Sequence, residues 1–310
     1  MTGRRSINTF SIISQDSPKA FPRFGWQRYA HDAPHNPSIM RERVVVKWGG
    51  GLITQKDAMK TVRNDVLDAL AEQLEDCLLE GVDVVLVHGA GSFGHLKAKT
   101  YQLAEGKREA THLPADLTQE EAVVDVRNDM LELNEHVLAA LTKRDVSAVS
   151  LPPHQWARNT GPDFEGDLAL FESAPPGIVV VTHGDVVDCD EPKRFGILSG
   201  DDLVYRLASE LSGVKRLVFA MGGVEGVLSE PPNGDGDESK LIEELLESDT
   251  FQGEHMSEMD VTGGIGLKVQ RGFQTSQHGV EVHLVSGEIG QRVRDACLGN
   301  DVRGTILRSS

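Results

Sequence analysis

Three glycine-rich segments of this chain could bind phosphate groups. The first, at residues 47–51, reads KWGGG, and a second lysine, Lys56, follows shortly after it. Glycines leave their backbone N–H groups open to phosphate oxygens because they carry no Cβ atom, and a lysine on each flank adds positive charge. The glycines alone could equally form only a tight turn. The segment is neither a Walker A sequence nor a dinucleotide-binding fingerprint, because both spacings are absent.

The second segment, HGAGSFGH at residues 88–95, is the most specific of the three. Three glycines and a serine between two histidines suit an anion-binding loop better than a packed core. A helix expected to begin near His95 would direct the positive end of its dipole toward the same anion. We therefore expect His95 to donate a hydrogen bond to a phosphoryl oxygen. His88 is expected to be a buried residue at the end of a strand.

The third segment, DVTGGIGLK at residues 260–268, ends on a lysine about one and a half turns inside an expected helix. From there Lys268 could reach back toward bound phosphates, although alone it would be read as a solvated surface lysine. Taken together, the three segments favour a phosphate-binding role for this lysine. Phosphoryl transfer needs cationic groups around aligned phosphates, and turns alone do not explain glycine loops with a lysine or histidine at three strand ends.

Two neighbouring acids follow the strand-like residues 195–198 in the motif FGILSGDD, and HGD precedes them at residues 183–185. Either acid could cap the start of a helix. A carboxylate at this place could also hold phosphate-binding lysines by charge-assisted hydrogen bonds. We expect that role for Asp201 and the helix cap for Asp202.

The elements around these loops alternate between β-branched runs and amphipathic helical patterns. Strands are expected at residues 43–48, 84–87, 146–151, 178–182, 217–220 and 281–286, with an edge strand at 304–307, and helices at 59–77, 122–141 and 203–211. The alternation predicts an α/β fold in which a mostly parallel central sheet has helices on both faces. Ligands of such sheets bind beyond the carboxyl ends of the strands, where the glycine loops lie.

Composition narrows the class of protein. The 310 residues are 39% hydrophobic, which is enough for one large α/β domain or two closely joined lobes. The net charge of -17 argues against a nucleic-acid partner, and any anion site must therefore be locally basic. Three widely separated cysteines without a CxxC pair support neither a metal site nor a disulfide framework. No apolar run is long enough to span a membrane.

Two segments are expected to lie outside the packed fold. Residues 1–42 mix arginines with serines and prolines, which is typical of an organelle-targeting leader or of a disordered tail. With such targeting left open, a cytoplasmic location is the default expectation. The acidic residues 231–258 are expected to form an exposed excursion without a function. The folded domain is therefore predicted at residues 43–310.

The ordered motifs KxGG, HGxGSFGH, HGD, FGxxSGDD and DVTGGxxxK resemble those of isopentenyl phosphate kinases, within the amino-acid kinase superfamily. The resemblance covers about residues 43–307. It implies an amino-acid-kinase-like αβα sandwich with an acceptor-binding lobe at about 43–212 and a nucleotide-binding lobe at about 213–310. It also implies a homodimer that uses ATP and Mg²⁺ to phosphorylate isopentenyl phosphate, giving isopentenyl diphosphate.

The resemblance assigns a role to each matching position. ATP would be held by Lys47, Gly49, Gly50, Gly51, Gly91, Gly264 and Lys268, and the acceptor by Ala90, His95 and Gly184. Lys56 and His95 would stabilise the transferring group, and Asp201 would organise the lysines. No covalent intermediate and no strong base are implied, because the acceptor phosphate is already anionic.

Some features leave alternatives open. Gly222 and Gly223 stand where the family has Thr and Asp, and Leu228 stands where it has Tyr, so the nucleotide preference is open. So is the length of the prenyl chain accepted. One alternative is a fosfomycin-kinase-like enzyme of the same fold. Another is a catalytically silent nucleotide-binding regulator, although the retained lysines and His95 argue against it.

Overall fold

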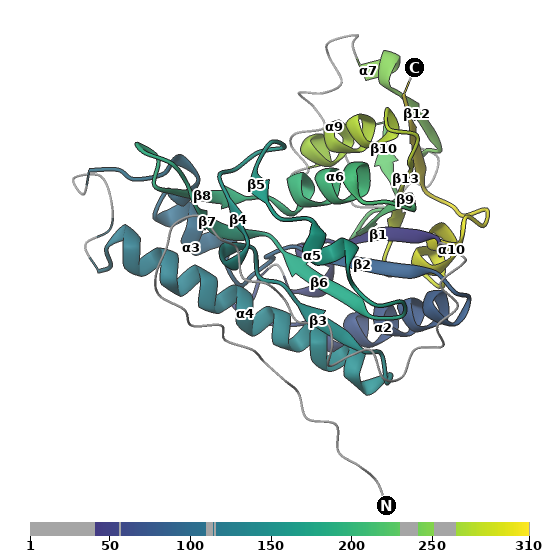
Figure 1. Ribbon diagram of the computed structural model, residues 1–310, viewed down its shortest axis with the longest axis horizontal. Helices are drawn as coiled ribbons and strands as arrows, with labels where there is room; N and C mark the ends of the chain where they lie inside the picture. The colour runs from purple at the N-terminus through teal and green to yellow at the C-terminus, as the bar shows by residue number, and fades with distance from the viewer. Residues whose placement is uncertain are drawn as a thin grey trace, which may run out of the picture.

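The computed structural model describes residues 41–55, 57–109, 114, 116–229, 241–250 and 265–309 (Figure 1). In these ranges the main sheet has eight strands in the order β12-β14-β13-β9-β1-β2-β6-β3. Their bounds are β1 Arg43–Trp48, β2 Asp83–His88, β3 Ala148–Ser150, β6 Val179–His183, β9 Val214–Met221, β12 Glu244–Leu246, β13 Glu281–Ser286 and β14 Thr305–Arg308. The strands from β13 to β3 in this order all pair in parallel, which confirms the predicted fold class.

Helices cover both faces of this sheet (Figure 1). One face packs against α2 (Asn64–Leu79), α4 (Gln119–Lys143) and α10 (Arg292–Leu298). The other face packs against α5 (Ala169–Glu172), α6 (Gly200–Glu210) and α9 (Ile265–Ser276). None of the helices in the described ranges combines the length and apolarity needed to cross a bilayer.

The remaining elements are short. A second sheet has the order β5-β4-β7-β8, with β4 at Ala157–Arg158, β5 at Glu165–Gly166, β7 at Asp185–Asp188 and β8 at Phe195–Leu198. The strands β10 (Val227–Leu228) and β11 (Leu241–Ile242) pair with each other. The short helices are α1 (Gly50–Ile53), α3 (His95–Thr100), α7 (Glu247–Thr250), and the 3₁₀ turns η2 (Leu103–Glu105) and η4 (Pro153–Gln155).

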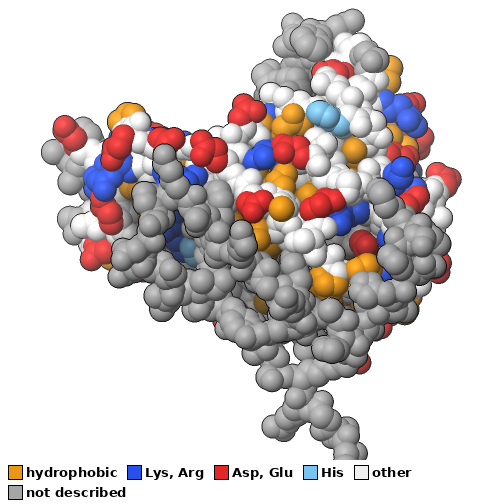
Figure 2. Space-filling view, viewed as in Figure 1, with side chains coloured by type: hydrophobic (Ala, Val, Ile, Leu, Met, Phe, Trp, Pro, Cys, Tyr) orange, Lys and Arg blue, Asp and Glu red, His pale blue; other side chains and the backbone are white. Residues whose placement is uncertain are grey.

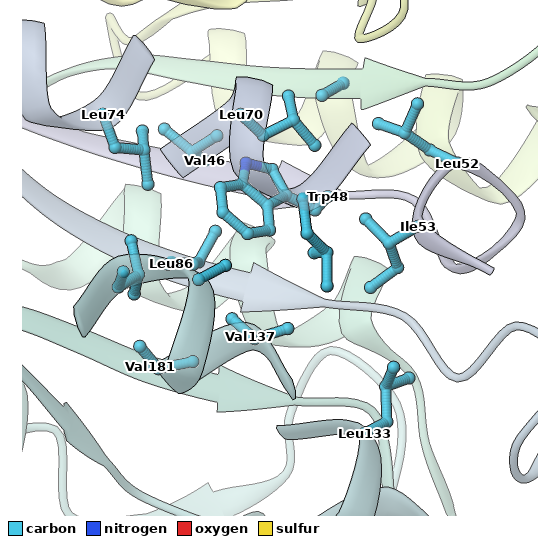
Figure 3. Close-up of a cluster of buried hydrophobic side chains, with 14 of the residues drawn as sticks. Val46, Trp48, Leu52, Ile53, Leu70, Leu74, Leu86, Leu133, Val137 and Val181 are labelled. Carbon is cyan, nitrogen blue, oxygen red and sulfur yellow. The ribbon is translucent and has the colours of Figure 1, made fainter. Parts of the chain in front are cut away.

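Strand β1 shows how alternation assigns side chains to the two faces. Val46 and Trp48 belong to the core under α2 and α4, and Figure 3 shows Trp48 among Leu70 and Leu86. Val45 belongs to the core under α6 and α9. Successive side chains of a strand point to opposite faces, so Lys47 is directed toward α6 and α9.

The parallel register brings the glycine segments together at the carboxyl ends of the strands. Trp48 pairs with His88 on one side and with Ala220 on the other. His88 pairs in turn with His183. The loops that follow β1, β2, β6 and β9 therefore leave the sheet together, at the edge where ligands of parallel sheets bind.

Three predictions were wrong: the first residues of two helices and the identity of the edge strand. Helix α2 begins at Asn64, so Met59, which is 72% exposed, lies in the preceding loop rather than on the helix. Helix α6 begins at Gly200, three residues earlier than expected. Strand β14 is not at the edge, because β12 from the acidic excursion pairs outside it. The rest of the excursion within residues 230–240 and 251–264 lies outside the described residues.

Candidate functional site

The loops after β1 and β2 are interlocked through their glycines. A Cβ atom at Gly50 would lie 2.2 Å from the backbone nitrogen of Gly91, and one at Gly89 would lie 2.6 Å from that of Gly50. Thr54 joins the loops further, because its Oγ1 accepts a hydrogen bond from the Ser92 N–H at 3.0 Å and donates to the Gly50 carbonyl at 2.8 Å. Only glycine allows backbones to approach so closely.

The other glycines and Ala90 of the predicted site surround this contact. A Cβ at Gly50 would lie 3.0 Å from the Ala90 nitrogen. Gly49 donates its N–H to the Ala220 carbonyl at 3.0 Å, and Gly184 donates to that of His88 at 3.1 Å. Gly51 lies within α1. These backbone contacts tie the ends of β1, β2, β6 and β9 together.

Two lysines meet the carboxylate of Asp201. The buried Lys47 donates from Nζ to Asp201 Oδ1, and the Nζ of Lys268 on α9 lies 3.8 Å from Oδ2. Ser199 caps α6, because its hydroxyl accepts hydrogen bonds from the backbone N–H groups of Asp201 and Asp202. This cap fixes the backbone position from which the side chain of Asp201 extends. Asp201 thus bridges strand β1 and helix α9, which are far apart in sequence. Such charge-assisted contacts are stronger than neutral hydrogen bonds.

Burial makes the charged form of Lys47 less stable than that of an exposed lysine. The pKa of Lys47 is lowered to about 8, chiefly because burial removes water from the ammonium; Asp201 raises this pKa, and the nearby charge of Lys268 lowers it. The ammonium also lies 5.9 Å from the ring centroid of Phe219. A phosphate group placed beside this ammonium would favour its charged form, because an opposite charge offsets the loss of water.

Asp202 does not cap the helix, contrary to the sequence-based expectation. The cap is Ser199, and the Oδ1 of Asp202 accepts from Arg271 Nε at 2.6 Å in a buried pair. Burial raises the pKa of Asp202 despite this partner. The pair fastens α6 to α9, the helix that carries Lys268.

The two histidines of the HGAGSFGH motif have different surroundings. His88 is buried, and its Nε2 lies 3.2 Å from Asn134 Oδ1. Burial lowers the pKa of His88 to about 3, with the neighbouring His183 ring, 5.0 Å away between centroids, as the next cause. The expected structural position of His88 is confirmed. His95 begins α3 and is exposed, and its imidazole makes no hydrogen bond to any described residue.

Steric and backbone constraints favour glycine at positions 222 and 223, where the resemblance leads one to expect Thr and Asp. A Cβ at Gly222 would lie 2.9 Å from the Cα of Leu52 in α1. Gly223 has a φ of +77° and donates its N–H to Glu288 Oε2 at 2.8 Å. Glu288 also pairs with Arg63. The β9 loop therefore lies directly against the β1 loop, in a conformation that favours glycine.

Two members of the predicted site, Lys56 and Gly264, lie outside the described residues. The remaining members fall on one edge of the sheet. Two further polar groups were given no role from the sequence, although one of them belongs to the HGD motif. One is the buried Asp129 with its lysine partners. The other is Asp185, whose buried carboxylate lies 2.6 Å from His154 Nδ1. The signal for Asp129 was present, because it falls on the apolar stripe of α4 between Val126 and Leu133.

Acidic side chains are scattered among basic ones on the face shown in Figure 2. Among the described residues, no group of three or more His, Cys, Asp or Glu side chains is arranged to hold a metal ion. Both carboxylate oxygens of Asp201 face lysines. The polar groups of the site are therefore suited to binding anions.

Comparison with known proteins agrees with this geometry. A family model described as the amino acid kinase family matches residues 42–286. The chain is similar to an isopentenyl phosphate kinase of Haloferax volcanii, with 34% identity over 270 residues that cover 86% of this chain and 98% of that protein. It is also similar to one of Methanothermobacter thermautotrophicus, with 30% identity over 274 residues, 85% of this chain and 98% of that protein. A crystal structure of isopentenyl phosphate kinase superimposes with a TM-score of 0.71 at 26% identity, covering 86% of this chain and 100% of that chain.

Proposed function

This chain belongs to the amino acid kinase family, within it to the isopentenyl phosphate kinases, and from that premise we propose that it phosphorylates isopentenyl phosphate with ATP. The products would be isopentenyl diphosphate and ADP. The observation that carries the proposal is the Lys47–Asp201–Lys268 cluster beside the interlocked loops of β1 and β2. Two cations on one carboxylate next to open backbone N–H groups suit a chain of adjoining phosphates.

On the nucleotide side, Lys47 and Lys268 would contact the β- and γ-phosphates, with Asp201 keeping both ammonium groups in place. Gly50, Gly51 and Gly91 would offer backbone N–H groups, while Gly49, whose own N–H donates to the Ala220 carbonyl, would let the phosphates approach the loop closely. Gly264, which precedes α9 in the sequence, would offer a further N–H group. Because Lys47 is buried, its charge would act with little screening by water. We accordingly propose residues 213–310 as the nucleotide-binding lobe, joined to the rest through the pairing of β9 with β1.

On the acceptor side, His95 would donate to the phosphate of isopentenyl phosphate, and Ala90 and Gly184 would position it. We propose residues 43–212 as this lobe. An oxygen of the acceptor phosphate would attack the γ-phosphorus in line, the bond to the β-phosphate oxygen would break, and ADP would leave with that electron pair. Lys56 and His95 would stabilise the charge on the transferring oxygens, where preorganised donors contribute most.

Magnesium fits this site through the nucleotide rather than through protein carboxylates. Mg²⁺ in kinases commonly keeps several waters and binds substrate phosphates. The engagement of both Asp201 oxygens with lysines agrees with that arrangement. When bound, Mg²⁺ would neutralise charge on the β- and γ-phosphates. The family resemblance further supports proposing a homodimer in the cytoplasm, which sizing chromatography and a localised fusion of the full chain would check.

The direct test is turnover by the purified full-length chain. With ATP, Mg²⁺ and isopentenyl phosphate, phosphorus NMR should show isopentenyl diphosphate and ADP appearing together. Fosfomycin, added as a competing acceptor, should be phosphorylated more slowly. Preferred turnover of fosfomycin would instead assign a phosphonate kinase. ATP binding without turnover of any short prenyl phosphate would point to a nucleotide-binding regulator.

A further inference from the structure

Asp129 is a carboxylate on the apolar face of a helix. It lies on α4 and is 4% exposed, between the buried residues Val126 and Leu133. A buried carboxylate is costly unless it is paired and hydrogen-bonded. Asp129 has two such partners: Lys60 Nζ at 2.6 Å and Lys97 Nζ at 3.1 Å.

The two lysines come from opposite flanks of the β2 loop, which we define as residues 89–94. Lys97 lies on α3, two residues after His95. Lys60 lies in the loop between α1 and α2, and its N–H donates to the Ser92 carbonyl at 3.3 Å. The β2 loop itself rests on α4, because a Cβ at Gly94 would lie 3.3 Å from Val126 and Met130. Asp129 therefore lies on the helix that supports the β2 loop, and it contacts one lysine from the segment on each side of that loop.

Lys60 is held in an unusual backbone conformation. Its φ is +49°, a left-handed value that is unfavourable for residues other than glycine. The surrounding structure must maintain such a conformation, and conformations of this kind cluster at functional sites. The hydrogen bond to Ser92 and the ion pair with Asp129 provide that support. The strain therefore marks the loop before α2 as a segment with a defined geometry.

Asp129 is distinguished from the other acids that contact these lysines. Lys60 also contacts Glu132 at 2.8 Å, and Lys97 contacts Asp125 at 3.1 Å. The side chains of Glu132 and Asp125 are 48% and 44% exposed, whereas that of Asp129 is 6% exposed. Exposed ion pairs contribute little to the stability of the fold, because water and salt screen their charges. Only Asp129 among these three acids joins both lysines.

We propose that Asp129 is a positioning residue that fixes the loop before α2 and helix α3 on either side of the β2 loop, so that phosphoryl transfer can proceed. The proposal rests on the function proposed above, because its consequence is catalytic. The loop before α2 includes Lys56 in its sequence, and α3 begins with His95. Asp129 would thus act through Lys97 on helix α3 and its His95, and through Lys60 on the loop before α2.

The first arm of the test measures positioning without any substrate. Hydrogen exchange of Asp129→Asn should rise in peptides covering residues 57–63 and 92–100, relative to the unchanged protein. Peptides covering β9 and β13 should exchange as before, which shows that the variant is folded. The matched controls are Asp125→Asn and Glu132→Gln, which each remove one exposed partner of the same lysines. Their exchange should stay unchanged.

The second arm measures catalysis with ATP, Mg²⁺ and isopentenyl phosphate. Asp129→Asn should lower kcat by about 10- to 100-fold, because small displacements of reacting groups cost that much. The KM for ATP should hold, since Lys47, Asp201 and Lys268 lie on other elements. The control variants should change kcat by less than about fivefold. A second substitution, Lys60→Gln, should add little to Asp129→Asn if the carboxylate acts through that lysine.

The two arms separate the two proposals. Raised exchange at both flanks with no turnover by the unchanged protein would support positioning by Asp129 and overturn the proposed acceptor. Normal turnover by the unchanged protein, with an Asp129→Asn variant that keeps its kcat or its exchange pattern, would overturn the role of Asp129. Equal losses in Asp125→Asn and Glu132→Gln would also overturn it, because surface charge would then explain the effect.

Discussion

The ammonium group of Lys47 and the carboxylate of Asp201 are in direct contact, although 154 positions separate them in the sequence. The contact joins the carboxyl end of β1 to the first turn of α6, and Lys268 adds a third member from α9. The glycine loops place backbone N–H groups at the same edge of the sheet. The two lysines, the carboxylate and the glycine loops therefore form one anion-binding cluster.

Asp201→Asn should reduce kcat/KM by about 100-fold or more, because it removes the acceptor that keeps Lys47 charged, and losing a preorganised donor such as this ammonium is usually of that scale. Burial already lowers the pKa of Lys47 to about 8, so without Asp201 the lysine would lose its proton near neutral pH. Steady-state kinetics at neutral pH checks this. Glu210→Gln, on the same helix and paired with Arg206, is the control and should behave as the unchanged enzyme. Comparable activity of the two variants would contradict the prediction.

The pH profile should show an alkaline limb from Lys47. The charged form binds phosphate, so kcat/KM should fall as the pH rises through about 8. The effect on stability has the opposite sign. The folded pKa lies below the ordinary value of 10.5, so the cost of burying the charge is present below pH 8 and is relieved as the pH rises toward 10.5.

Two measurements check this assignment. In kcat/KM profiles, the limb should move to lower pH in Asp201→Asn, because Asp201 raises the pKa of Lys47. In denaturant titrations, the share of the unfolding free energy that depends on Lys47 should increase over the same range and vanish in Lys47→Met. A limb at the same pH in both enzymes would assign the titration to another group.

Gly50→Ala should inactivate the enzyme by separating the interlocked loops. The added Cβ would lie 2.2 Å from the Gly91 nitrogen, so the backbone must shift. Overpacking of this kind costs about 1 to 3 kcal/mol of unfolding free energy. Gly161→Ala is the control, since its Cβ would meet nothing within 4 Å and only its φ of +87° is unfavourable. Gly161→Ala should lose about 1 kcal/mol and keep its activity. Activity retained by Gly50→Ala would show that the loops tolerate separation.

Arg271→Met should be strongly destabilising because it leaves the buried Asp202 without its partner. Breaking a buried ion pair costs about 3 to 5 kcal/mol, whereas replacing both members can be nearly neutral. The double variant Asp202→Leu/Arg271→Met should therefore recover much of the stability, and urea unfolding of the two variants and the unchanged protein measures this. A double variant as unstable as the single one would mean that the two side chains are not coupled.

The sequence was sufficient to predict the parallel sheet and the edge at which the site lies. The reason is local: β-branched runs such as residues 84–87 end in glycines, and strand exits of a parallel sheet share one edge. The contact of Asp201 with two lysines was also anticipated, because a carboxylate at a strand-to-helix turn can hold phosphate-binding lysines by charge-assisted hydrogen bonds. The partner of Asp202 was not, since a second acid after Ser199 is equally compatible with a cap.

What escaped prediction depends on contacts between distant segments. Asp129 interrupts the apolar stripe of α4, but nothing local indicates that Lys60 and Lys97 reach it from two different loops. The edge strand β12 was missed because three residues of an acidic segment carry little periodicity, and pairing with β14 decides their conformation. The start of α2 was misplaced because Met59 continues the helical spacing although it is exposed.

The most direct test of the central claim is calorimetric binding of ATP and of isopentenyl phosphate to His95→Ala and Lys268→Ala. In the proposed site, the imidazole of His95 contacts the acceptor and Lys268 on α9 contacts the nucleotide. His95→Ala should bind isopentenyl phosphate about 10- to 100-fold more weakly and ATP normally, and Lys268→Ala should show the reverse. The proposed pair of phosphate sites is contradicted if each variant loses affinity for both ligands equally. It is also contradicted if neither variant loses affinity for either ligand.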